Sequence, residues 1–269
     1  MPMLRFLYPS SCVLCGAKGV GDRDLCADCF AGLSWNRHPC PRCAVPLPPD
    51  ADTPLCGECI KSLPSWDEAK SPLAYGFPVD KLVQRFKFEG DLAMGRLLGG
   101  LLADYLAAGT DRPDCILPVP LHPSRLKERG FNQAVELARP LSKRLRVKIR
   151  LDLCARTRAT EVQSKLDAAE RRKNLKGAFA VQESVQGMHL ALLDDVVTTG
   201  TTMEELSRVL RDAGRGRQAH HGVEPVPRRE PPGLIHKPGL TRRSSQWPRA
   251  PRLIPAVRAF RIILRDIFP

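Results

Sequence analysis

A thirteen-residue run, Leu190 to Thr202, constrains the fold of this chain more than any other segment. It begins with an apolar stretch that has no helical period, which predicts a buried strand of a parallel sheet. Two adjacent carboxylates, Asp194 and Asp195, follow this stretch, and a turn made almost wholly of Thr and Gly comes next. A helical pattern then starts at Met203. The order of strand, acidic pair, small-residue loop and helix predicts an α/β domain.

The loop in this run is suited to bind a phosphate. Gly200 lets the backbone turn where a Cβ would clash, so consecutive N–H groups can converge on an anion. A helix N-terminus also offers amide donors and partial positive charge. Thr201 and Thr202 are expected to cap the helix, with Glu204 and Glu205 in the place of capping-box acids. The alternative is a capped helix after a core strand, with two solvated aspartates.

The acidic pair lies where open α/β sheets bind ligands, at the carboxyl end of the predicted strand. Carboxylates repel a phosphate, so the natural partners of Asp194 and Asp195 are sugar hydroxyls or a metal ion. The run as a whole therefore predicts a site for a phosphorylated sugar.

This run closely resembles the phosphoribosyl pyrophosphate (PRPP) signature of the type I phosphoribosyltransferases. The resemblance implies that Asp194 and Asp195 are the catalytic pair and bind the ribose 2′- and 3′-hydroxyls. It implies that the 5′-phosphate is held by Thr198, Thr199, Gly200, Thr201 and Thr202. Mg²⁺ accompanies the pyrophosphate, which leaves C1 of the ribose while a nitrogen base attacks. Catalysis in such an enzyme is mainly positioning and charge stabilisation.

Cysteine spacing is the second strong signal. Each C-x-x-C pair presents two thiolates from one tight turn, and two such knuckles complete a tetrahedral zinc site. The four pairs are Cys12/Cys15, Cys26/Cys29, Cys40/Cys43 and Cys56/Cys59. Two structural zinc ions are expected. Four knuckles allow three pairings, of which the sequential one is mildly preferred.

A disulfide framework and a redox dithiol are the alternatives to zinc. The segment from Met1 to Ser10 has only a short apolar patch, interrupted by Arg5 and Pro9, and does not read as a secretory signal. A cytoplasmic location is therefore expected, and a reducing cytoplasm favours zinc over disulfides. Four C-x-x-C pairs are also poorly explained by one redox dithiol. Cys115 and Cys154 stand alone and are expected to be ordinary buried residues.

The middle of the chain is expected to complete the site. Apolar residues recur at helical spacing over 79–108, with a break at 89–91, which predicts two helices. Residues 115–120 predict a buried strand that proline terminates. A basic loop over 121–133 and a second over 156–174 flank the signature run, as a diphosphate substrate requires.

Further motifs narrow the resemblance to the ComF family of competence-associated proteins. These motifs are Pro118 to Leu121, Arg129 to Gln133, Arg156 with Thr157 and Arg158, Gln163, Arg172 with Asn174, and Gly177 to Phe179. The family joins a cysteine-rich zinc module to a phosphoribosyltransferase-like domain, and the resemblance covers about residues 4–214.

The narrower resemblance implies a cytoplasmic bacterial protein, linked in some relatives to DNA uptake. It places Arg125 and Arg129 near the pyrophosphate. It places Arg156, Arg172 and Asn174 on a mobile loop that closes over the site.

Three segments result: a double zinc ribbon over 1–64, a phosphoribosyltransferase-like domain over 65–214, and an irregular basic tail over 215–269. The tail contains nine prolines, twelve Lys/Arg and three Asp/Glu, so it supplies most of the net charge of +13. It contains no strand pattern before Ile254, although the fold needs one more strand after residue 214. A frameshift that leaves this tail poorly ordered is the preferred interpretation. The alternative is a genuine basic arm for DNA or a lipid surface, with 256–267 as an amphipathic helix.

Two classes of function remain open. The chain is either a phosphoribosyltransferase that acts on an unidentified nitrogen base, or a binding protein that kept the PRPP or nucleotide pocket. In the second case its zinc knuckles and basic loops engage single-stranded DNA or a protein of the DNA-uptake machinery. No segment has the roughly eighteen uninterrupted apolar residues of a transmembrane helix, so no membrane span is expected.

Overall fold

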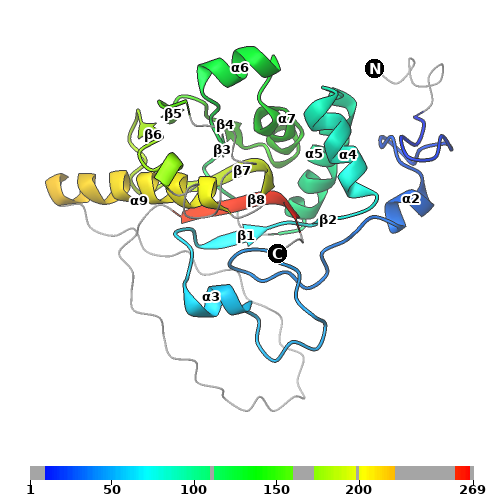
Figure 1. The fold of residues 1–269 in the computed structure, drawn as a ribbon, viewed down its shortest axis with the longest axis horizontal. Coiled ribbons are helices and arrows are strands. Elements are labelled where there is room, and N and C mark those ends of the chain that lie inside the picture. The colour runs from blue at the N-terminus through cyan, green and yellow to red at the C-terminus, as the bar shows by residue number, and fades with distance from the viewer. Residues whose placement is uncertain (1–9, 110–111, 160–172, 198–199, 222–257, 267–269) are drawn as a thin grey trace.

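The structure, a computed structural model, describes residues 10–109, 112–159, 173–197, 200–221 and 258–266 (Figure 1). Its centre is a parallel sheet with the strand order β1-β8-β7-β3-β4, and the short strand β2 pairs with β8 at one end. The strands are β1 (Glu68–Lys70), β2 (Ala74–Tyr75), β3 (Cys115–Pro118), β4 (Lys148–Ile149), β7 (His189–Val197) and β8 (Arg258–Asp266). A separate antiparallel pair consists of β5 (Cys154–Arg156) and β6 (Phe179–Val181). The predicted α/β architecture with a parallel sheet is confirmed.

Helices cover both faces of this sheet. The helices are α2 (Ala27–Ala31), α3 (Gly57–Lys61), α4 (Val79–Phe88), α5 (Leu92–Ala107), α6 (Pro123–Arg129), α7 (Gln133–Leu145) and α9 (Thr201–His221). In β7, Leu190 and Leu192 pack into one apolar cluster together with α9, whereas Ala191 and Leu193 pack into another with α4, α5 and α7. Successive strand residues point to opposite faces, so a strand covered on both sides must be apolar throughout. This explains the uninterrupted apolar run.

The predicted break between the first two helices is confirmed. Helix α4 ends at Phe88 and α5 begins at Leu92, with Gly90 between them at φ +69°. The Asp91 carboxylate caps α5 by accepting a 3.0 Å hydrogen bond from Ala93 N–H. A Cβ at Gly95 would lie 2.5 Å from the ring of Phe86, so the missing side chain lets the two helices pack closely.

The predicted basic loop at 121–133 is in part a helix. Residues Pro123–Arg129 form α6, which begins with a proline at its first turn and ends at Gly130 in the left-handed conformation. The Asn132 side chain then caps α7 by accepting from Ala134 N–H at 2.9 Å, and it donates to the Val119 carbonyl at 3.0 Å. Proline at the start and glycine at the end explain why this polar segment is helical.

Both ends of the predicted phosphoribosyltransferase-like domain differ from the expectation. Near its start, residues 68–70 form β1, a strand that sequence analysis did not predict. Residues 258–266 form β8, which pairs in parallel with both β1 and β7, so these residues are not the amphipathic helix considered as an alternative. Hydrogen bonding of β1 to β8, and of β8 to its neighbours on both sides, has outweighed the weak local pattern of these segments.

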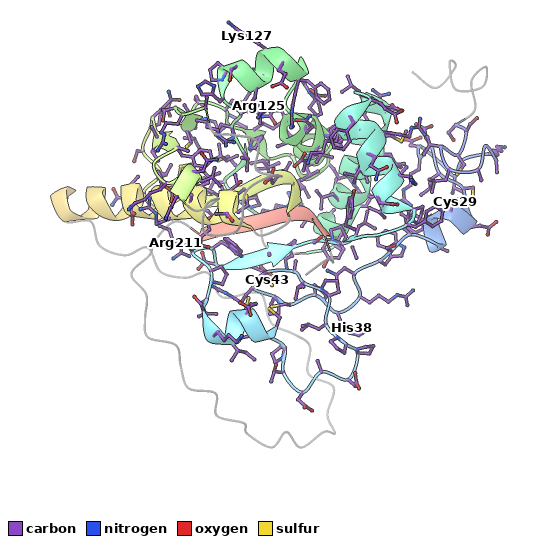
Figure 2. All side chains as sticks on the ribbon, in the orientation of Figure 1. Cys29, His38, Cys43, Arg125, Lys127 and Arg211 are labelled. Atoms are coloured by element: carbon purple, nitrogen blue, oxygen red, sulfur yellow. The ribbon has the colours of Figure 1, made fainter. Side chains whose placement is uncertain are left out.

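The two cysteine clusters pack on opposite sides of the sheet. We call the segment around Cys12, Cys15, Cys26 and Cys29 ribbon 1, and the segment around Cys40, Cys43, Cys56 and Cys59 ribbon 2. Ribbon 1 shares the apolar cluster of α4, α5 and α7, whereas ribbon 2 shares the cluster of α9. Figure 2 shows Cys29 on α2 and Cys43 near α3, in separate parts of the molecule. Within the described ranges, no helix combines the length and the apolar character that a membrane crossing requires.

Candidate functional site

The eight clustered cysteines form two four-sulfur groups in sequential order. Within each group all sulfur atoms lie within 4.8 Å of one another. The Sγ atoms of Cys15 and Cys26 are 3.6 Å apart, and those of Cys43 and Cys56 are 3.5 Å apart. Four sulfurs bound tetrahedrally at about 2.3 Å from zinc lie about 3.8 Å from each other, which matches these separations. The cysteines are unbridged, and the two groups are Cys₄ zinc sites.

The ionisation of these cysteine thiols also favours the binding of a divalent cation. Burial opposes ionisation of Cys12, but backbone N–H groups, those of Leu14 and Cys15 among them, outweigh it and lower the pKa of its thiol to about 6. The neighbouring sulfurs of Cys15 and Cys26 raise the pKa of the Cys29 thiol. Four crowded thiolates therefore repel one another, and a bound Zn²⁺ relieves this repulsion.

The two solitary cysteines are ordinary core residues, as predicted. Cys115 in β3 and Cys154 in β5 are 2% and 1% exposed. Burial raises the pKa of Cys115 to about 11 and that of Cys154 to about 12. Both thiols stay protonated and are poor metal ligands or nucleophiles at neutral pH.

The acidic pair lies inside β7, at a β-bulge. Leu193 pairs with Ile262 and Val196 with Leu264, so Asp194 and Asp195 together oppose one residue of β8. An extra residue in one strand re-aims the side chains there, and bulges are frequent beside active sites. Asp195 N–H donates to Asp194 Oδ1 at 2.9 Å, which ties the pair together. The sequence placed the pair after the strand, but β7 continues to Val197.

Lys87 of α4 provides a cation for this pair that sequence analysis missed. Its Nζ lies 3.0 Å from Asp195 Oδ2, and the two side chains are only 24% and 14% exposed. Lys87 follows Val83 by four residues and so continues the buried stripe of α4. A lysine on a buried stripe is a sequence signal that could have identified it.

The Asp194 carboxylate is the most perturbed acid of the site. Burial, and then the neighbouring Asp195, raise the pKa of Asp194 to about 7, whereas Lys87 and the Asp195 N–H oppose the rise. Groups with shifted pKa values concentrate at functional sites, although structural ion pairs shift them too.

Arg156 lies within electrostatic range of Asp194, and Arg125 lies within electrostatic range of Arg156. Burial lowers the pKa of the Arg156 guanidinium; Asp194 opposes this effect and Arg125 adds to it. Arg156 is the last residue of β5, and its guanidinium lies 5.7 Å from the centre of the Phe179 ring in β6. Arg125 belongs to α6, which follows the end of β3 beside β7. The structure thus brings Arg156 near Asp194 and Arg125 near Arg156.

Gly200, directly before α9, has the backbone conformation that its place in the sequence predicted. Gly200 adopts φ +77°, a left-handed conformation that suits glycine, and its carbonyl accepts from Glu204 N–H at 2.9 Å. This is the first intrahelical bond of α9, so Gly200 is the N-cap residue. Thr201 and Thr202 are the first two helical residues, and the prediction that they cap the helix is wrong.

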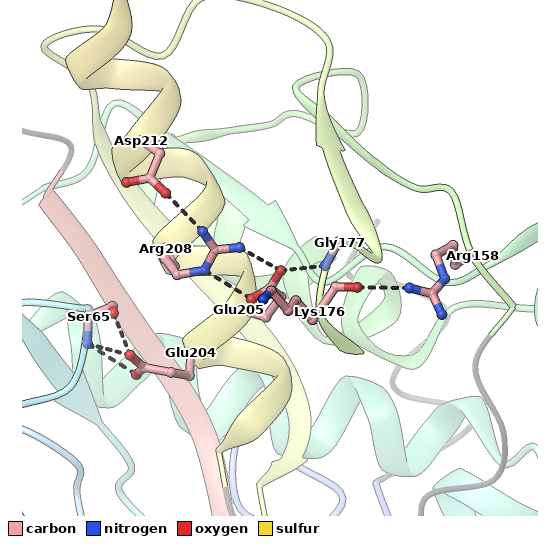
Figure 3. A network of polar contacts seen from close by, with 8 residues as sticks. All are labelled: Ser65, Arg158, Lys176, Gly177, Glu204, Glu205, Arg208 and Asp212. Atoms are coloured by element: carbon pink, nitrogen blue, oxygen red, sulfur yellow. Dashed lines mark hydrogen bonds and ion pairs between the residues drawn. The ribbon is translucent and has the colours of Figure 1, made fainter. Parts of the chain in front are cut away.

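The two glutamates expected in a capping box bond elsewhere (Figure 3). The Glu204 carboxylate accepts from Ser65 N–H at 3.1 and 3.2 Å and from the Ser65 hydroxyl. The Glu205 carboxylate accepts from Gly177 N–H at 2.7 Å and from Arg208 at 2.8 and 3.1 Å. Because the N-cap is glycine, no side chain there can complete a capping box, and both acids join α9 to neighbouring segments instead.

Arg129 and Asn174, which are also predicted site residues, lie in the described part of the structure. Arg129 donates to Gln133 Oε1 at 3.3 Å, across the turn between α6 and α7. Asn174 is partly buried beside the fully buried Leu175. Thr198, Thr199 and Arg172 lie outside the described residues.

The N-terminal part of the chain matches a family model. Residues 3–69 match the model of the double zinc ribbon domain. This range includes both four-sulfur groups and ends within β1.

Curated relatives match most of the chain. The DNA utilization protein YhgH of Escherichia coli K12 is 36% identical over 211 residues, which cover 75% of this chain and 91% of that protein. Competence protein F of Haemophilus influenzae is 36% identical over 214 residues, covering 76% of this chain and 91% of that protein. Competence protein ComFC of Bacillus subtilis is 29% identical over 209 residues, covering 72% and 80%. With both zinc sites and the α/β sheet in place, the chain belongs to the ComF family of competence-associated proteins.

Proposed function

We propose that this protein binds PRPP together with Mg²⁺ and transfers phosphoribose to a nitrogen base. The observation that carries the proposal is the acid pair at the bulge of β7, followed within five residues by the Gly200 turn and the start of α9. This arrangement supports one site in which carboxylates accept hydrogen bonds from sugar hydroxyls on one side and backbone amides donate to a phosphate on the other.

In this proposal the protein acts by holding the sugar and its leaving group. The Asp194 and Asp195 carboxylates accept hydrogen bonds from the ribose 2′- and 3′-hydroxyls, and the turn at Gly200 binds the 5′-phosphate. Arg156 lies within electrostatic range of both Asp194 and Arg125, and the two arginines are suited to face the pyrophosphate. Mg²⁺ supplies charge neutralisation on the pyrophosphate. Catalysis then consists of positioning and stabilisation of charge as the bond to C1 breaks.

The names of the relatives suggest a biological setting for this activity. DNA utilization protein and Competence protein are consistent with a role in the use of DNA taken up from outside, in the cytoplasm of a bacterium. A phosphoribosyltransferase in that setting acts on free bases released from DNA.

Binding of PRPP tests the proposal directly. Calorimetric titration with PRPP and Mg²⁺ is expected to show one site per chain, and Asp194→Asn and Asp195→Asn are each expected to abolish it. The exposed Asp50 provides a control, because Asp50→Asn changes the net charge equally and lies in ribbon 2. Wild-type protein that gives no heat with PRPP and Mg²⁺ would contradict the proposal.

A second candidate is a PRPP- or nucleotide-binding protein without transferase activity that engages single-stranded DNA or a DNA-uptake protein. It is favoured by the basic outer surface of α6, where Figure 2 shows Arg125 and Lys127, and by the names of the relatives. It predicts salt-sensitive binding of a fluorescent single-stranded oligonucleotide. Binding that is absent, or unchanged between low and high salt, would exclude it. Growth on DNA that survives Asp194→Asn would instead exclude the transferase.

A further inference from the structure

The second zinc knuckle is bonded to the segment that leads into the sheet. Arg42 lies between Cys40 and Cys43, and its guanidinium donates to the carbonyls of Trp66 at 2.6 Å and of Asp67. The Trp66 indole N–H donates back to the Arg42 carbonyl. An arginine on a zinc knuckle thus fixes the position of residues 64–67.

The same segment is bonded to α9. Ser65 donates from both its backbone N–H and its hydroxyl to the Glu204 carboxylate (Figure 3). Two turns further along α9, Arg211 forms a 2.7 Å ion pair with Asp67, and its side chain is only 14% exposed. Ribbon 2 is therefore joined to the first and the third turn of the helix that follows the Gly200 turn.

A common apolar core supports these polar contacts. Cys40 and Trp66 of the N-terminal part belong to the same buried cluster as Met203, Leu206 and Leu210 of α9. Met203, Leu206 and Leu210 are fully buried. Ribbon 2 and α9 therefore cannot move independently without opening this core.

Glu204 lies one turn inside the helix whose start faces the proposed phosphate. An unbound carboxylate there could turn toward the loop and repel the ligand. The two donors of Ser65 hold it on the side of ribbon 2 instead.

We propose that Glu204 is a positioning residue through which ribbon 2 fixes the first turn of α9 and keeps negative charge away from the phosphate-binding turn. The zinc centre of ribbon 2 thereby supports the PRPP site, whereas that of ribbon 1 supports the opposite face of the sheet. The effect on PRPP rests on the proposed function, but the ordering of α9 does not.

Hydrogen exchange measures the ordering without any ligand. In Glu204→Ala, the amides of residues 204–207, the first that are bonded within α9, are expected to exchange about tenfold faster than in the wild type, since hydrogen bonds to a charged group are lost. Ser65→Ala keeps the backbone N–H donor and is expected to have a smaller effect of the same sign. Arg23→Ala serves as the control, because it removes a comparable 2.7 Å ion pair between ribbon 1 and Asp104 of α5. Equal exchange in the wild type and both variants would overturn the proposal.

Affinity for PRPP tests the consequence for the site. Glu204→Ala is expected to bind PRPP about tenfold more weakly while two zinc ions per chain are retained. Glu204→Gln keeps an acceptor for Ser65 and is expected to restore most of the affinity. The double variant Ser65→Ala/Glu204→Ala is expected to be no weaker than Glu204→Ala alone, because both remove the same contact.

The outcomes separate the two proposals. Wild-type protein that fails to bind PRPP overturns the proposed function and leaves the exchange result to decide the role of Glu204. Wild-type binding that Glu204→Ala leaves unchanged overturns the positioning role alone.

Hydrogen exchange is also expected to distinguish the two zinc sites. Cys56→Ser in ribbon 2 and Cys15→Ser in ribbon 1 are each expected to lose one zinc ion per chain by native mass spectrometry. Only Cys56→Ser is expected to accelerate exchange at residues 204–207. Equal acceleration in the two variants would overturn the assignment of the effect to ribbon 2.

Discussion

The ammonium group of Lys87 lies 3.0 Å from the carboxylate of Asp195, and this ion pair joins helix α4 to the acid pair in β7. Both side chains are largely buried, so solvent and salt screen the pair less than a surface ion pair. The pair partly offsets the repulsion between the two adjacent aspartates, and it makes α4, the helix that shares an apolar cluster with ribbon 1, part of the candidate site.

Removal of Lys87 is expected to weaken PRPP binding. Lys87→Ala leaves two adjacent carboxylates without their nearest cation, and this excess negative charge repels the phosphates. We expect the Kd for PRPP with Mg²⁺ to rise about tenfold at pH 8, as for the loss of one partly buried ion pair. Lys81→Ala, which removes an exposed lysine of the same helix, is the matched control in calorimetric titration. A Kd equal to that of the control would contradict a role for Lys87.

The pH dependence of PRPP binding is expected to follow Asp194. Its pKa is raised to about 7, and only the ionised carboxylate accepts hydrogen bonds through both oxygens. Affinity should therefore increase as the pH rises through 7. Because Lys87 lowers the pKa of Asp194, the midpoint in Lys87→Ala should move to higher pH. Comparison of the two proteins between pH 6 and 9 cancels the titration of PRPP itself, and identical midpoints would refute the assignment.

Asp194→Asn is expected to stabilise the protein at alkaline pH while it abolishes PRPP binding. The pKa of Asp194 is raised from 3.8 to about 7 on folding, so the folded state retains a proton that the unfolded state has released. This acid therefore lowers the free energy of unfolding as the pH rises from about 4 to 7, and the cost is complete above 7. Urea unfolding at pH 8 should show the variant about 2 kcal/mol more stable, with no difference near pH 4. A variant less stable at pH 8 would contradict the burial of this charge.

Zinc removal is expected to unfold the N-terminal module. Ribbon segments this small bury little apolar surface of their own, so metal binding supplies their folding free energy. A strong chelator should release two zinc ions per chain, with loss of protection from proteolysis over residues 10–61. Cys154→Ser, which replaces a buried cysteine outside both four-sulfur groups, should retain both ions. A zinc content other than two per chain would disagree with the two sites.

Residues 258–266 of the tail are expected to be required for a stable sheet, whether or not a frameshift produced the tail. Strand β8 lies between β1 and β7, so its loss leaves two strands without their shared neighbour. A chain that ends at residue 257 should lose cooperative thermal unfolding. If a frameshift produced this tail, the alternative frame across the codons of Gln218 to Arg229 should stay open and encode an apolar strand. A closed alternative frame would favour a genuine basic arm.

Local sequence patterns predicted those parts of the structure that depend on a single short segment. The C-x-x-C spacing predicted both zinc sites, since each knuckle is complete within four residues. The apolar run before Asp194 predicted β7, and the break at Gly90 predicted the separation of α4 from α5. These signals depend on a few neighbouring residues, so they can be recognised without knowledge of the tertiary fold.

Contacts between distant segments could not be predicted in this way. Lys87 meets Asp195 only because α4 packs on the face of the sheet beside β7. Glu204 bonds to Ser65 rather than to its own helix start, across 139 residues of sequence. β1 and β8 have weak patterns of their own and are strands because they pair with each other.

The placement of β1 has a consequence for synthesis on the ribosome. Among the described strands, β1 pairs only with β8, which is made almost two hundred residues later. Trp66 must likewise wait for α9 before its side chain is enclosed. The amino-terminal third of the chain therefore leaves the exit tunnel with its sheet edge and apolar surface uncovered. It reaches its final state only after β8 has left the tunnel, and until then its metal ions are its main source of order.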